Sequence, residues 1–331
     1  MAEKKNHLYG PVPSRRLGRS LGVDIVPFKV CSLDCVYCQL GRTLTKTVDR
    51  GDYVPIEAVL AELKQALAER IEVDYISIAG SGEPTLHARL GELIDGIRHV
   101  TDVPVAIITN GTLFYLPDVR KDCAKADVVM PSLDAADEET FRRINHPCQG
   151  INLEKVISGL CAFREEFSGQ IWLEVFLVEG INTGADQIAR IREAAERIRP
   201  DKVQLNTAVR PRADARVRRV DAETLRRVAG WLGPDCEIIA DSSPGHHEAL
   251  ADETPQAASS SSGAREATEQ SLLSMLKRRP CSLRDIHASL GLSRSEAMKH
   301  LGDLQRRGLV RSEKRGASTF YKASPSAECK D

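Results

Sequence analysis

The sequence lacks long hydrophobic runs, an export signal and a strong net charge. None of its apolar stretches approaches the roughly 18 residues that a membrane-spanning helix needs. The basic residues near the start are followed by no apolar stretch, so we expect no signal peptide. A formal net charge of -1 implies no general affinity for nucleic acid or for membranes. These absences predict a cytoplasmic protein without a membrane partner.

What is present is an ordinary mixture for a folded protein, with 42% hydrophobic and 28% charged residues. This composition excludes collagen-like chains, fully disordered chains and small disulfide-held scaffolds. Nine cysteines in a chain without an export signal should stay reduced. Cysteines that cluster in the sequence therefore indicate metal or redox chemistry.

Two parts of the chain differ in charge. Residues 265–331 contain 14 Lys or Arg and 8 Asp or Glu, whereas the rest contains 32 and 39. Between these parts, residues 243–264 are rich in Ala, Ser and Pro and show no regular apolar spacing. This composition is typical of a flexible linker, and the segment is long for a loop inside one domain. We predict a first domain over residues 1–242 and a small module over residues 265–331.

The first domain alternates between short β-branched runs and amphipathic helices. Apolar residues recur at three- and four-residue spacing over residues 56–71 and 185–198, which predicts helices. Repeated alternation implies an α/β fold with parallel strands and right-handed crossovers. A parallel barrel and a doubly wound sheet both fit, and either places the chemistry at the carboxyl ends of the strands. The predicted strands cover residues 22–26, 75–79, 105–109, 128–132, 171–178 and 203–206.

Three cysteines lie within eight residues, directly after the first predicted strand: Cys31, Cys35 and Cys38. Thiolates at this density suit a soft metal centre. Three core cysteines on one face of a helix are the alternative, but Pro27 and the polar residues between the cysteines interrupt an apolar helix. A structural zinc ion needs four ligands, and the fourth would have to come from a distant part of the chain.

The spacing CxxxCxxC, with Tyr37 before the last cysteine, resembles the cluster loop of the radical S-adenosylmethionine (radical SAM) enzymes. The resemblance implies a partial parallel (β/α)6 barrel and one [4Fe–4S] cluster with Cys31, Cys35 and Cys38 on three of its irons. The fourth iron is then left open for SAM, as in other catalytic metal sites. Residues 9–22 resemble the opening of a subgroup that includes relatives of the tRNA wybutosine-synthesis enzyme. The flavodoxin-like domain of that enzyme has no counterpart in this sequence.

Segments at the other predicted strand ends resemble the SAM-binding motifs of this family. Gly80, Gly82 and Glu83 look like its glycine–glutamate motif, whose carboxylate binds the SAM amine, although Ser81 replaces a more usual glycine. The alternatives are local roles: an ordinary turn, a helix cap or, for Glu174, an ion pair with an arginine. The resemblance assigns further SAM contacts to Thr109, Asn110, Ser132, Asp134, Glu174 and Asn206.

The resemblance also implies the reaction. A one-electron donor such as a ferredoxin or flavodoxin reduces the cluster, and the cluster electron cleaves SAM into methionine and a 5′-deoxyadenosyl radical. The radical then abstracts a hydrogen atom from the substrate. The sequence does not identify that substrate.

Candidate substrate residues flank the predicted barrel. Two arginines precede the first strand and two follow the sixth, so they would form an anion site if the barrel brings its ends together. Solvent-exposed charges are the alternative. His146 and Cys148 follow the fourth strand and would donate a hydrogen atom or a proton, or ligate a second cluster. The four arginines are Arg15, Arg16, Arg210 and Arg212.

The small module has the pattern of a winged helix-turn-helix domain. Two helix patterns, over residues 266–280 and 282–291, precede a third that starts with Ser293 as N-cap and Glu296 three residues on, a capping box. Residues 311–323 then read as a two-stranded wing that turns near Gly316. The resemblance implies that the third helix enters the major groove of nucleic acid, or that the module recognises a protein or the substrate.

Together these patterns favour a radical SAM enzyme with an appended winged-helix module. The alternative from another class is an iron–sulfur redox sensor that regulates transcription by binding DNA through the winged helix. The SAM motifs favour the enzyme because a sensor has no need to hold SAM. A zinc-binding structural protein is the third interpretation.

Overall fold

The computed structural model describes residues 7–69, 71–240, 262–315 and 318–324. The part before residue 240 is built on one eight-stranded sheet with the order β1-β2-β5-β6-β7-β8-β9-β10. Neighbouring strands are parallel except β1 and β2, which form an antiparallel hairpin at one edge. The strands are β1 (Leu8–Ser14), β2 (Gly18–Val23), β5 (Tyr75–Ile78), β6 (Val105–Ile108), β7 (Val128–Met130), β8 (Gln170–Leu177), β9 (Lys202–Thr207) and β10 (Cys236–Ile238).

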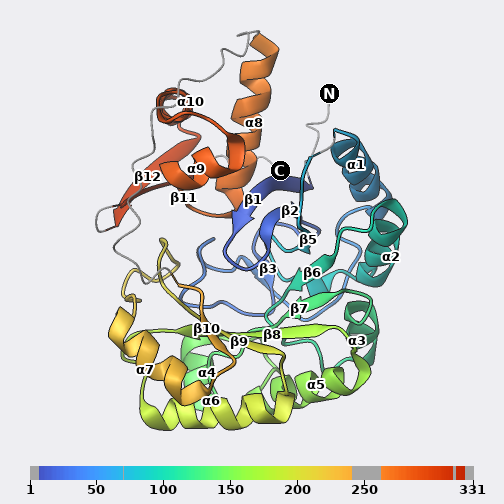
Figure 1. Cartoon of the computed structure of the whole chain (residues 1–331), viewed down its shortest axis with the longest axis vertical. Helices are drawn as coiled ribbons and strands as arrows, with labels where there is room; N and C mark the ends of the chain where they lie inside the picture. The colour runs from blue at the N-terminus through green and yellow to red at the C-terminus, as the bar shows by residue number, and fades with distance from the viewer. Residues whose placement is uncertain (1–6, 70, 241–261, 316–317, 325–331) are drawn as a thin grey trace.

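Helices connect the parallel strands and cover the outer side of the curved sheet (Figure 1). Their apolar faces supply the core, as Val59 and Leu63 on the first helix and Ile94 and Ile97 on the next illustrate. The helices are α1 (Ile56–Ala68), the 3-10 turn η1 (Pro84–Leu86), α2 (Leu90–Val100), α3 (Pro117–Cys123), α4 (Glu138–Asn145), α5 (Leu153–Glu166), α6 (Ala185–Ile198) and α7 (Ala222–Leu232). A separate pair of short parallel strands is formed by β3 (Val30–Cys31) and β4 (Thr45–Lys46).

The predicted α/β fold with a largely parallel sheet is confirmed, and the six predicted strands correspond to β2 and β5 to β9. The first strand was placed too late: β2 ends at Val23, whereas residues 22–26 were predicted. Ile25 and Val26 are buried in the loop after β2, so the apolar pattern there indicates burial and not strand pairing. The edge strands β1 and β10 were not predicted.

After residue 262 the chain forms three helices and a three-stranded sheet with the order β11-β13-β12, which confirms the predicted winged helix-turn-helix arrangement. The predicted capping box of Ser293 and Glu296 is present, and Gly291 ends the second helix with a φ of +65°. The predicted wing turn at residues 316–317 lies outside the described residues. The elements are α8 (Ser262–Arg278), β11 (Cys281–Ser282), α9 (Leu283–Leu290), α10 (Arg294–Arg306), β12 (Val310–Arg315) and β13 (Ser318–Ala323).

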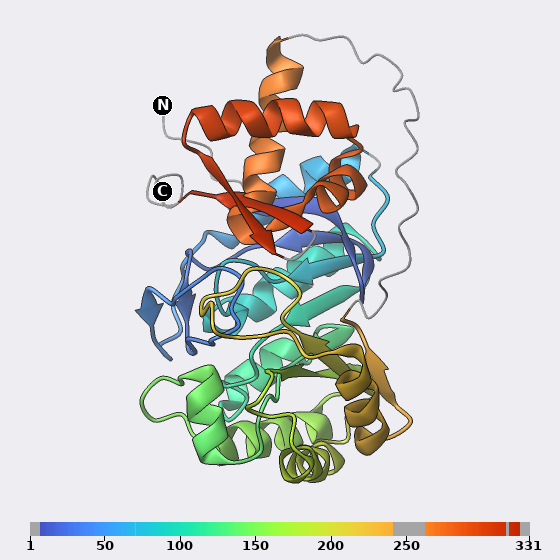
Figure 2. The ribbon, with the colours of Figure 1, turned by 90° about the vertical axis from the view of Figure 1, so that its left-hand side faces the viewer.

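The winged-helix module packs on β1 (Figure 2). Leu8 of β1 belongs to the core of the sheet domain, whereas Val12 lies in one cluster with Leu272 and Met275 of α8 and Ile286 of α9. The β1–β2 pairing is irregular between Tyr9 and Val12, which allows Leu8 and Val12 to face different hydrophobic cores. The two hydrophobic cores therefore share one strand.

The predicted linker is described only at its end. The helix α8 begins at Ser262, and residues 243–261 lie outside the described residues. The predicted domain boundaries therefore stay a prediction. Among the described residues, no helix combines the length and apolar character that crossing a membrane requires.

Candidate active site

The loop that carries the three cysteines follows β2 and is held by three other segments. Its first part pairs with the loop after β5, where the Lys29 amide donates to the Ser81 carbonyl at 2.7 Å. Its middle exchanges backbone hydrogen bonds with residues 144–148. Its end pairs with the loop after β9, where the Ala213 amide donates to the Cys38 carbonyl at 2.8 Å. The cysteines therefore lie where several loops from the carboxyl ends of strands meet.

Each of the three cysteine sulfurs has one N–H donor from a side chain. Asparagine and lysine N–H groups beside a sulfur favour the thiolate over the neutral thiol, and such donors tune the potential of an iron–sulfur cluster. The contacts are Asn110 Nδ2 to Cys31 Sγ at 3.5 Å, Asn145 Nδ2 to Cys35 Sγ at 3.5 Å and Lys29 Nζ to Cys38 Sγ at 3.2 Å.

Burial keeps the free thiols of Cys31 and Cys35 protonated. Loss of hydration raises the pKa of Cys31 to about 12, and the nearby Glu83 carboxylate adds to the shift. Burial and the Asp134 carboxylate likewise raise the pKa of Cys35 well above its ordinary value. Thiols in this setting are inert until a metal replaces their protons.

The three cysteines could in principle hold a single metal ion or an iron–sulfur cluster. In the described ranges, no three His, Cys, Asp or Glu side chains are arranged to hold one metal ion. A structural zinc site places four ligands on one ion. A [4Fe–4S] cluster binds each thiolate at a different iron and so spreads its ligands farther apart. Three thiols, each with an N–H donor, are a donor set that such a cluster accepts. Their role as its ligands stays a prediction.

The loop after β5 approaches its neighbours so closely that glycine is required at two positions. A Cβ at Gly80 would lie 2.3 Å from Cγ of Asp24, and a Cβ at Gly82 would lie 2.1 Å from the carbonyl oxygen of Val30. Gly80 also has a φ of +154°, which side chains other than glycine rarely allow. These contacts give a physical reason for the glycine–glutamate pattern.

Glu83 is buried and accepts hydrogen bonds from the chain itself. Its Oε1 accepts from the Thr85 amide at 3.1 Å and the Thr109 hydroxyl at 2.6 Å, and its Oε2 accepts from the Asn110 amide at 2.8 Å. Burial nevertheless raises the pKa of Glu83. Oε2 accepts only the Asn110 amide among the described residues, so it keeps capacity for a further donor such as the SAM amine.

Tyr37 and Asp134 support the cluster loop. The Tyr37 hydroxyl donates to Asp134 Oδ2, which also accepts from Asn145 Nδ2 at 2.7 Å. The Phe176 amide donates to the other Asp134 oxygen at 2.9 Å, and the rings of Tyr37 and Phe176 stack with centroids 3.9 Å apart. Burial raises the pKa of Asp134 to about 6. The structure thus places both residues at the cluster loop, with contacts to the chain, and a contact of either with SAM stays a prediction.

Ser132 and Glu174 lie side by side, as partners in a bridge between the β7 and β8 segments. Arg16 donates to the Glu174 carboxylate, and both side chains are mostly buried. A SAM hydroxyl would therefore have to share this carboxylate with Arg16. Asn206, near the end of β9, is buried, and its Oδ1 accepts from the Thr207 amide at 3.0 Å.

The four predicted arginines have separate partners. Arg15, in the turn between β1 and β2, reaches a backbone carbonyl just beyond β10 at 2.6 Å, so it bridges the two edges of the sheet. Arg210 forms an ion pair with Asp285 of α9 at 3.0 Å, and Arg212 donates to carbonyls of its own loop. These contacts, with that of Arg16 described above, do not join the four into one site.

His146 and Cys148 line a pocket of about 340 Å³ beside the cluster loop. His146 ends α4 in a left-handed conformation with a φ of +42°, and the Cys148 amide donates to the Ser32 carbonyl at 2.9 Å. Lys46 and Arg142 line the same pocket. The structure therefore brings the two residues next to the cysteines, and their donor role stays a prediction.

Comparison with known families identifies the superfamily of the chain. The model of the radical SAM superfamily matches residues 25–193, which include the three cysteines and the loops after β5, β6 and β7. The chain belongs to the radical SAM superfamily. The model of the IclR helix-turn-helix domain matches residues 272–314, within the winged-helix module. The predicted superfamily and the predicted type of module are confirmed.

This radical SAM protein has relatives over nearly its whole length. It is 30% identical over 318 residues to a UPF0026 protein of Helicobacter pylori, covering 95% of this chain and 96% of the relative. It is 37% identical over 311 residues to a protein of Brachyspira hyodysenteriae named GTPase Obg, covering 94% of this chain but only 44% of that protein. Among solved structures, a radical SAM methyltransferase from Sphaerobacter thermophilus overlaps 67% of this chain and 66% of its own at 16% identity, with a TM-score of 0.49. The predicted subgroup stays a prediction.

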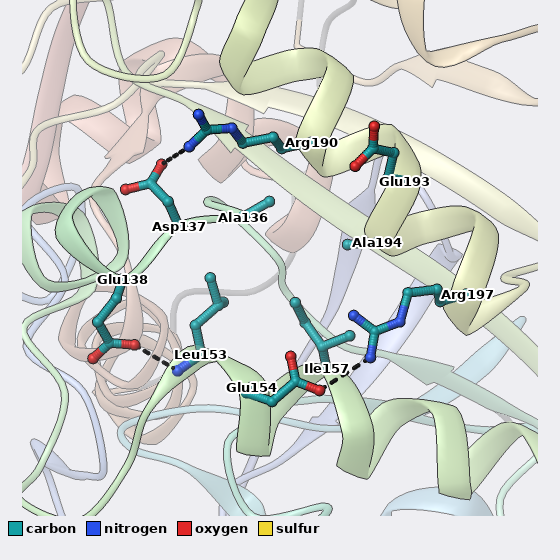
Figure 3. A pocket seen from close by; sticks show the side chains of 10 residues that line it. All are labelled: Ala136, Asp137, Glu138, Leu153, Glu154, Ile157, Arg190, Glu193, Ala194 and Arg197. Atoms are coloured by element: carbon teal, nitrogen blue, oxygen red, sulfur yellow. Dashed lines mark hydrogen bonds and ion pairs between the residues drawn. The ribbon is translucent and has the colours of Figure 1, made fainter.

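A larger pocket of about 500 Å³ lies between α4, α5 and α6 (Figure 3). Arg197 pairs there with Glu154 at 3.0 Å, and Arg190 approaches Asp137 at 3.9 Å. Because these opposite charges compensate each other and none of the predicted site residues lines it, this pocket is not a candidate active site.

Sequence patterns missed three residues that the structure places at the radical SAM loops. Lys29 is buried with its ammonium on Cys38, Asn145 bridges Cys35 and Asp134, and Asp24 holds the loop after β5. Each reads as an ordinary polar residue in the sequence. The positive φ of Lys29, +60°, and the contact of Asn145 with a cysteine 110 residues away are properties of the folded chain, so no local signal identifies them.

Proposed function

We propose that the chain is a radical SAM enzyme that holds one [4Fe–4S] cluster on Cys31, Cys35 and Cys38. When bound, the cluster and SAM supply hydrogen-atom abstraction from a substrate, through reductive cleavage of SAM. The observation that carries the proposal is the trio of sulfurs with three N–H donors, on a loop anchored to the loop after β5. The superfamily match covers every proposed SAM contact except Asn206 and therefore favours an enzyme over a transcriptional regulator.

The residues of the chain bind and orient the two cofactors in this proposal. Glu83 accepts the SAM amine on Oε2, and Thr109 fixes that carboxylate through its hydroxyl. Asn110 contacts both the cluster loop and Glu83, so it relates the two cofactor positions. The proposed SAM contacts are Tyr37, Gly80, Gly82, Glu83, Thr109, Asn110, Ser132, Asp134, Glu174 and Asn206.

The substrate site in this proposal borders the cluster loop. Arg210 and Arg212 belong to the loop that covers Cys38, and His146 and Cys148 lie on another side of the cluster loop. Guanidinium and imidazole groups at this place favour an anionic substrate. Arg15 and Arg16 would contribute by closing the barrel.

Two partners complete the proposal. Cluster reduction requires a one-electron donor such as a ferredoxin or a flavodoxin. For the winged helix we propose nucleic acid, because α10 exposes Arg294 and Lys299 while α8 and α9 form the contact with β1. The match to a helix-turn-helix family supports this choice.

Anaerobic reconstitution with iron and sulfide tests the proposed activity. We expect about four irons per chain and slow release of 5′-deoxyadenosine with SAM and dithionite, even without the true substrate. Cys35→Ser should lose both. Cys161→Ser is the matched control, because Cys161 is a partly buried cysteine on α5, and it should keep both.

Two results would contradict the proposal. One is a reconstituted chain that holds no iron–sulfur cluster. The other is a chain that holds the cluster but cleaves no SAM. An iron content near eight per chain would instead reveal a second cluster.

A further inference from the structure

The contact between the sheet domain and the winged-helix module buries an ion pair. Arg278, at the end of α8, donates through Nε to Oδ2 of Asp24, in the loop after β2, at 3.0 Å. The two side chains are only 11% and 8% exposed. The same guanidinium lies 4.8 Å from the ring centre of Tyr9, whose hydroxyl donates to the Ala79 carbonyl at 3.4 Å. A buried pair of this kind tolerates few geometries, so it fixes how the module docks.

Asp24 connects this ion pair to the loop after β5. Its Oδ1 accepts from the Ser81 amide at 3.1 Å, and its Oδ2 accepts from the Ser81 hydroxyl at 2.6 Å. Gly80 packs against the same carboxylate, with space for no side chain between them. One carboxylate therefore touches both the guanidinium of the module and the loop that leads to Glu83.

We infer that Arg278 is a positioning residue for SAM binding, so that the winged-helix module completes the cofactor site of the sheet domain. The inference rests on the proposed function, in which residues 80–83 bind SAM. Arg278 touches neither cofactor in this arrangement; it acts through Asp24 and Ser81.

The physical reason is the cost of a buried carboxylate without its cation. When Arg278 is replaced, Asp24 keeps only neutral donors from Ser81, and turning toward water restores the solvation of its charge. Because Asp24 binds Ser81 through both oxygens and contacts Gly80, such a turn carries the loop with it. Glu83, two residues after Ser81, then moves out of position relative to Thr109.

The coupling works in both directions. If docking of the module favours SAM binding, SAM must favour docking of the module by the same factor. Loaded protein should therefore hold the last turn of α8 more firmly than protein without SAM.

The test compares SAM binding by anaerobically reconstituted full-length proteins, measured by equilibrium dialysis. We expect Arg278→Gln to raise the Kd for SAM about tenfold or more, with unchanged iron content, because a buried hydrogen bond to a charged group is worth this much. Arg278→Lys should recover part of the affinity for SAM, because lysine restores the positive charge but not the planar guanidinium group. Arg284→Gln removes an exposed arginine of α9 and should bind SAM like the wild type.

Steady-state kinetics distinguish a role of Arg278 in positioning the SAM site from a general loss of folded structure. Arg278→Gln should raise the KM for SAM, while 5′-deoxyadenosine release at saturating SAM stays within about twofold of the wild type. Equal SAM affinity of Arg278→Gln and the wild type would overturn the inference alone. A wild-type chain that binds no SAM would overturn the proposed function itself.

Hydrogen exchange of the wild type gives a second readout that does not depend on a variant. SAM should slow amide exchange in the last turn of α8, around Arg278. The helix α7, which packs on α6 and β10, serves as the internal reference and should show no change. Unchanged exchange at α8 in SAM-loaded protein would contradict the coupling.

Discussion

At the residue scale, His87 shows how one buried side chain makes folding depend on pH. Its Nδ1 accepts from the Arg89 amide at 3.1 Å, and its Nε2 pairs with the Val54 carbonyl at 3.0 Å. This pattern fits a neutral ring that carries its proton on Nε2. Burial lowers the pKa of His87 below its ordinary value. Protonation of Nδ1 would break the bond to Arg89.

We therefore expect the free energy of unfolding to fall as the pH drops below about 6.5, the ordinary pKa of histidine. In this pH range the histidine is protonated in the unfolded chain but stays neutral in the folded chain. The free energy of unfolding therefore rises with pH, by at most about 1.4 kcal/mol per pH unit. Urea unfolding at about pH 5.5 and about pH 7.5 measures this slope. His87→Gln should flatten it, whereas His99→Gln, at an exposed position of α2, should not. A slope that His87→Gln leaves unchanged would show that another group is responsible.

Residue patterns predicted the parts of the site that are close in the sequence. Cys31, Cys35 and Cys38 share one loop, and Gly80 and Glu83 share another, so spacing alone brings each group together. The N–H donors on the sulfurs come from three separate segments and leave no mark on spacing. Their positions depend on how loops from several strands converge, which the sequence does not specify locally.

At the element scale, amphipathic spacing was the most dependable signal. The helix predicted over residues 185–198 is α6 (Ala185–Ile198), because its buried isoleucines and alanines recur at three- to four-residue spacing. Two of the missed strands, β1 and β10, lie at the edges of the main sheet. The strand β1 (Leu8–Ser14) contains two prolines and a glycine, which an edge tolerates and a central strand does not. The other, β10, has three residues, too few to show a period.

The orientation of α10 predicts nucleic-acid binding that depends on salt. Replacing Arg294 and Lys299 together by Gln should weaken binding of a DNA duplex at low salt and lower the salt slope by about 0.9 for each phosphate that is no longer neutralised. The matched control replaces Arg226 and Arg227, two exposed arginines of α7, by Gln. Fluorescence anisotropy over a salt series measures both. If the two double variants bind the DNA duplex equally well, α10 is not the nucleic-acid-binding helix. The same conclusion follows if the wild type does not bind the duplex at low salt.

At the scale of the whole molecule, the decisive contacts join distant parts of the sequence. Arg278 and Asp24 are 254 residues apart, and Arg210 and Asp285 are 75 apart. Composition distinguishes the two parts by their charge but does not show that they share β1. Sharing a strand turns an appended module into a structural neighbour of the site, because β1 is hydrogen-bonded to β2 and the cluster loop follows β2.

This shared strand predicts that the two parts unfold together. Val12 is 7% exposed and lies in the hydrophobic cluster of the module, so Val12→Lys places an unpaired charge in that core. The backbone pairing of β1 with β2 does not involve this side chain. Calorimetry should therefore show one transition for the wild type and two for Val12→Lys, the first at lower temperature. Leu44→Lys, at a side chain that is 71% exposed, adds the same charge and should keep one transition. Two transitions in the wild type would mean that the sheet domain and the module unfold independently despite sharing β1. The role inferred for Arg278 would then depend on its contact with Asp24 alone and not on cooperative folding.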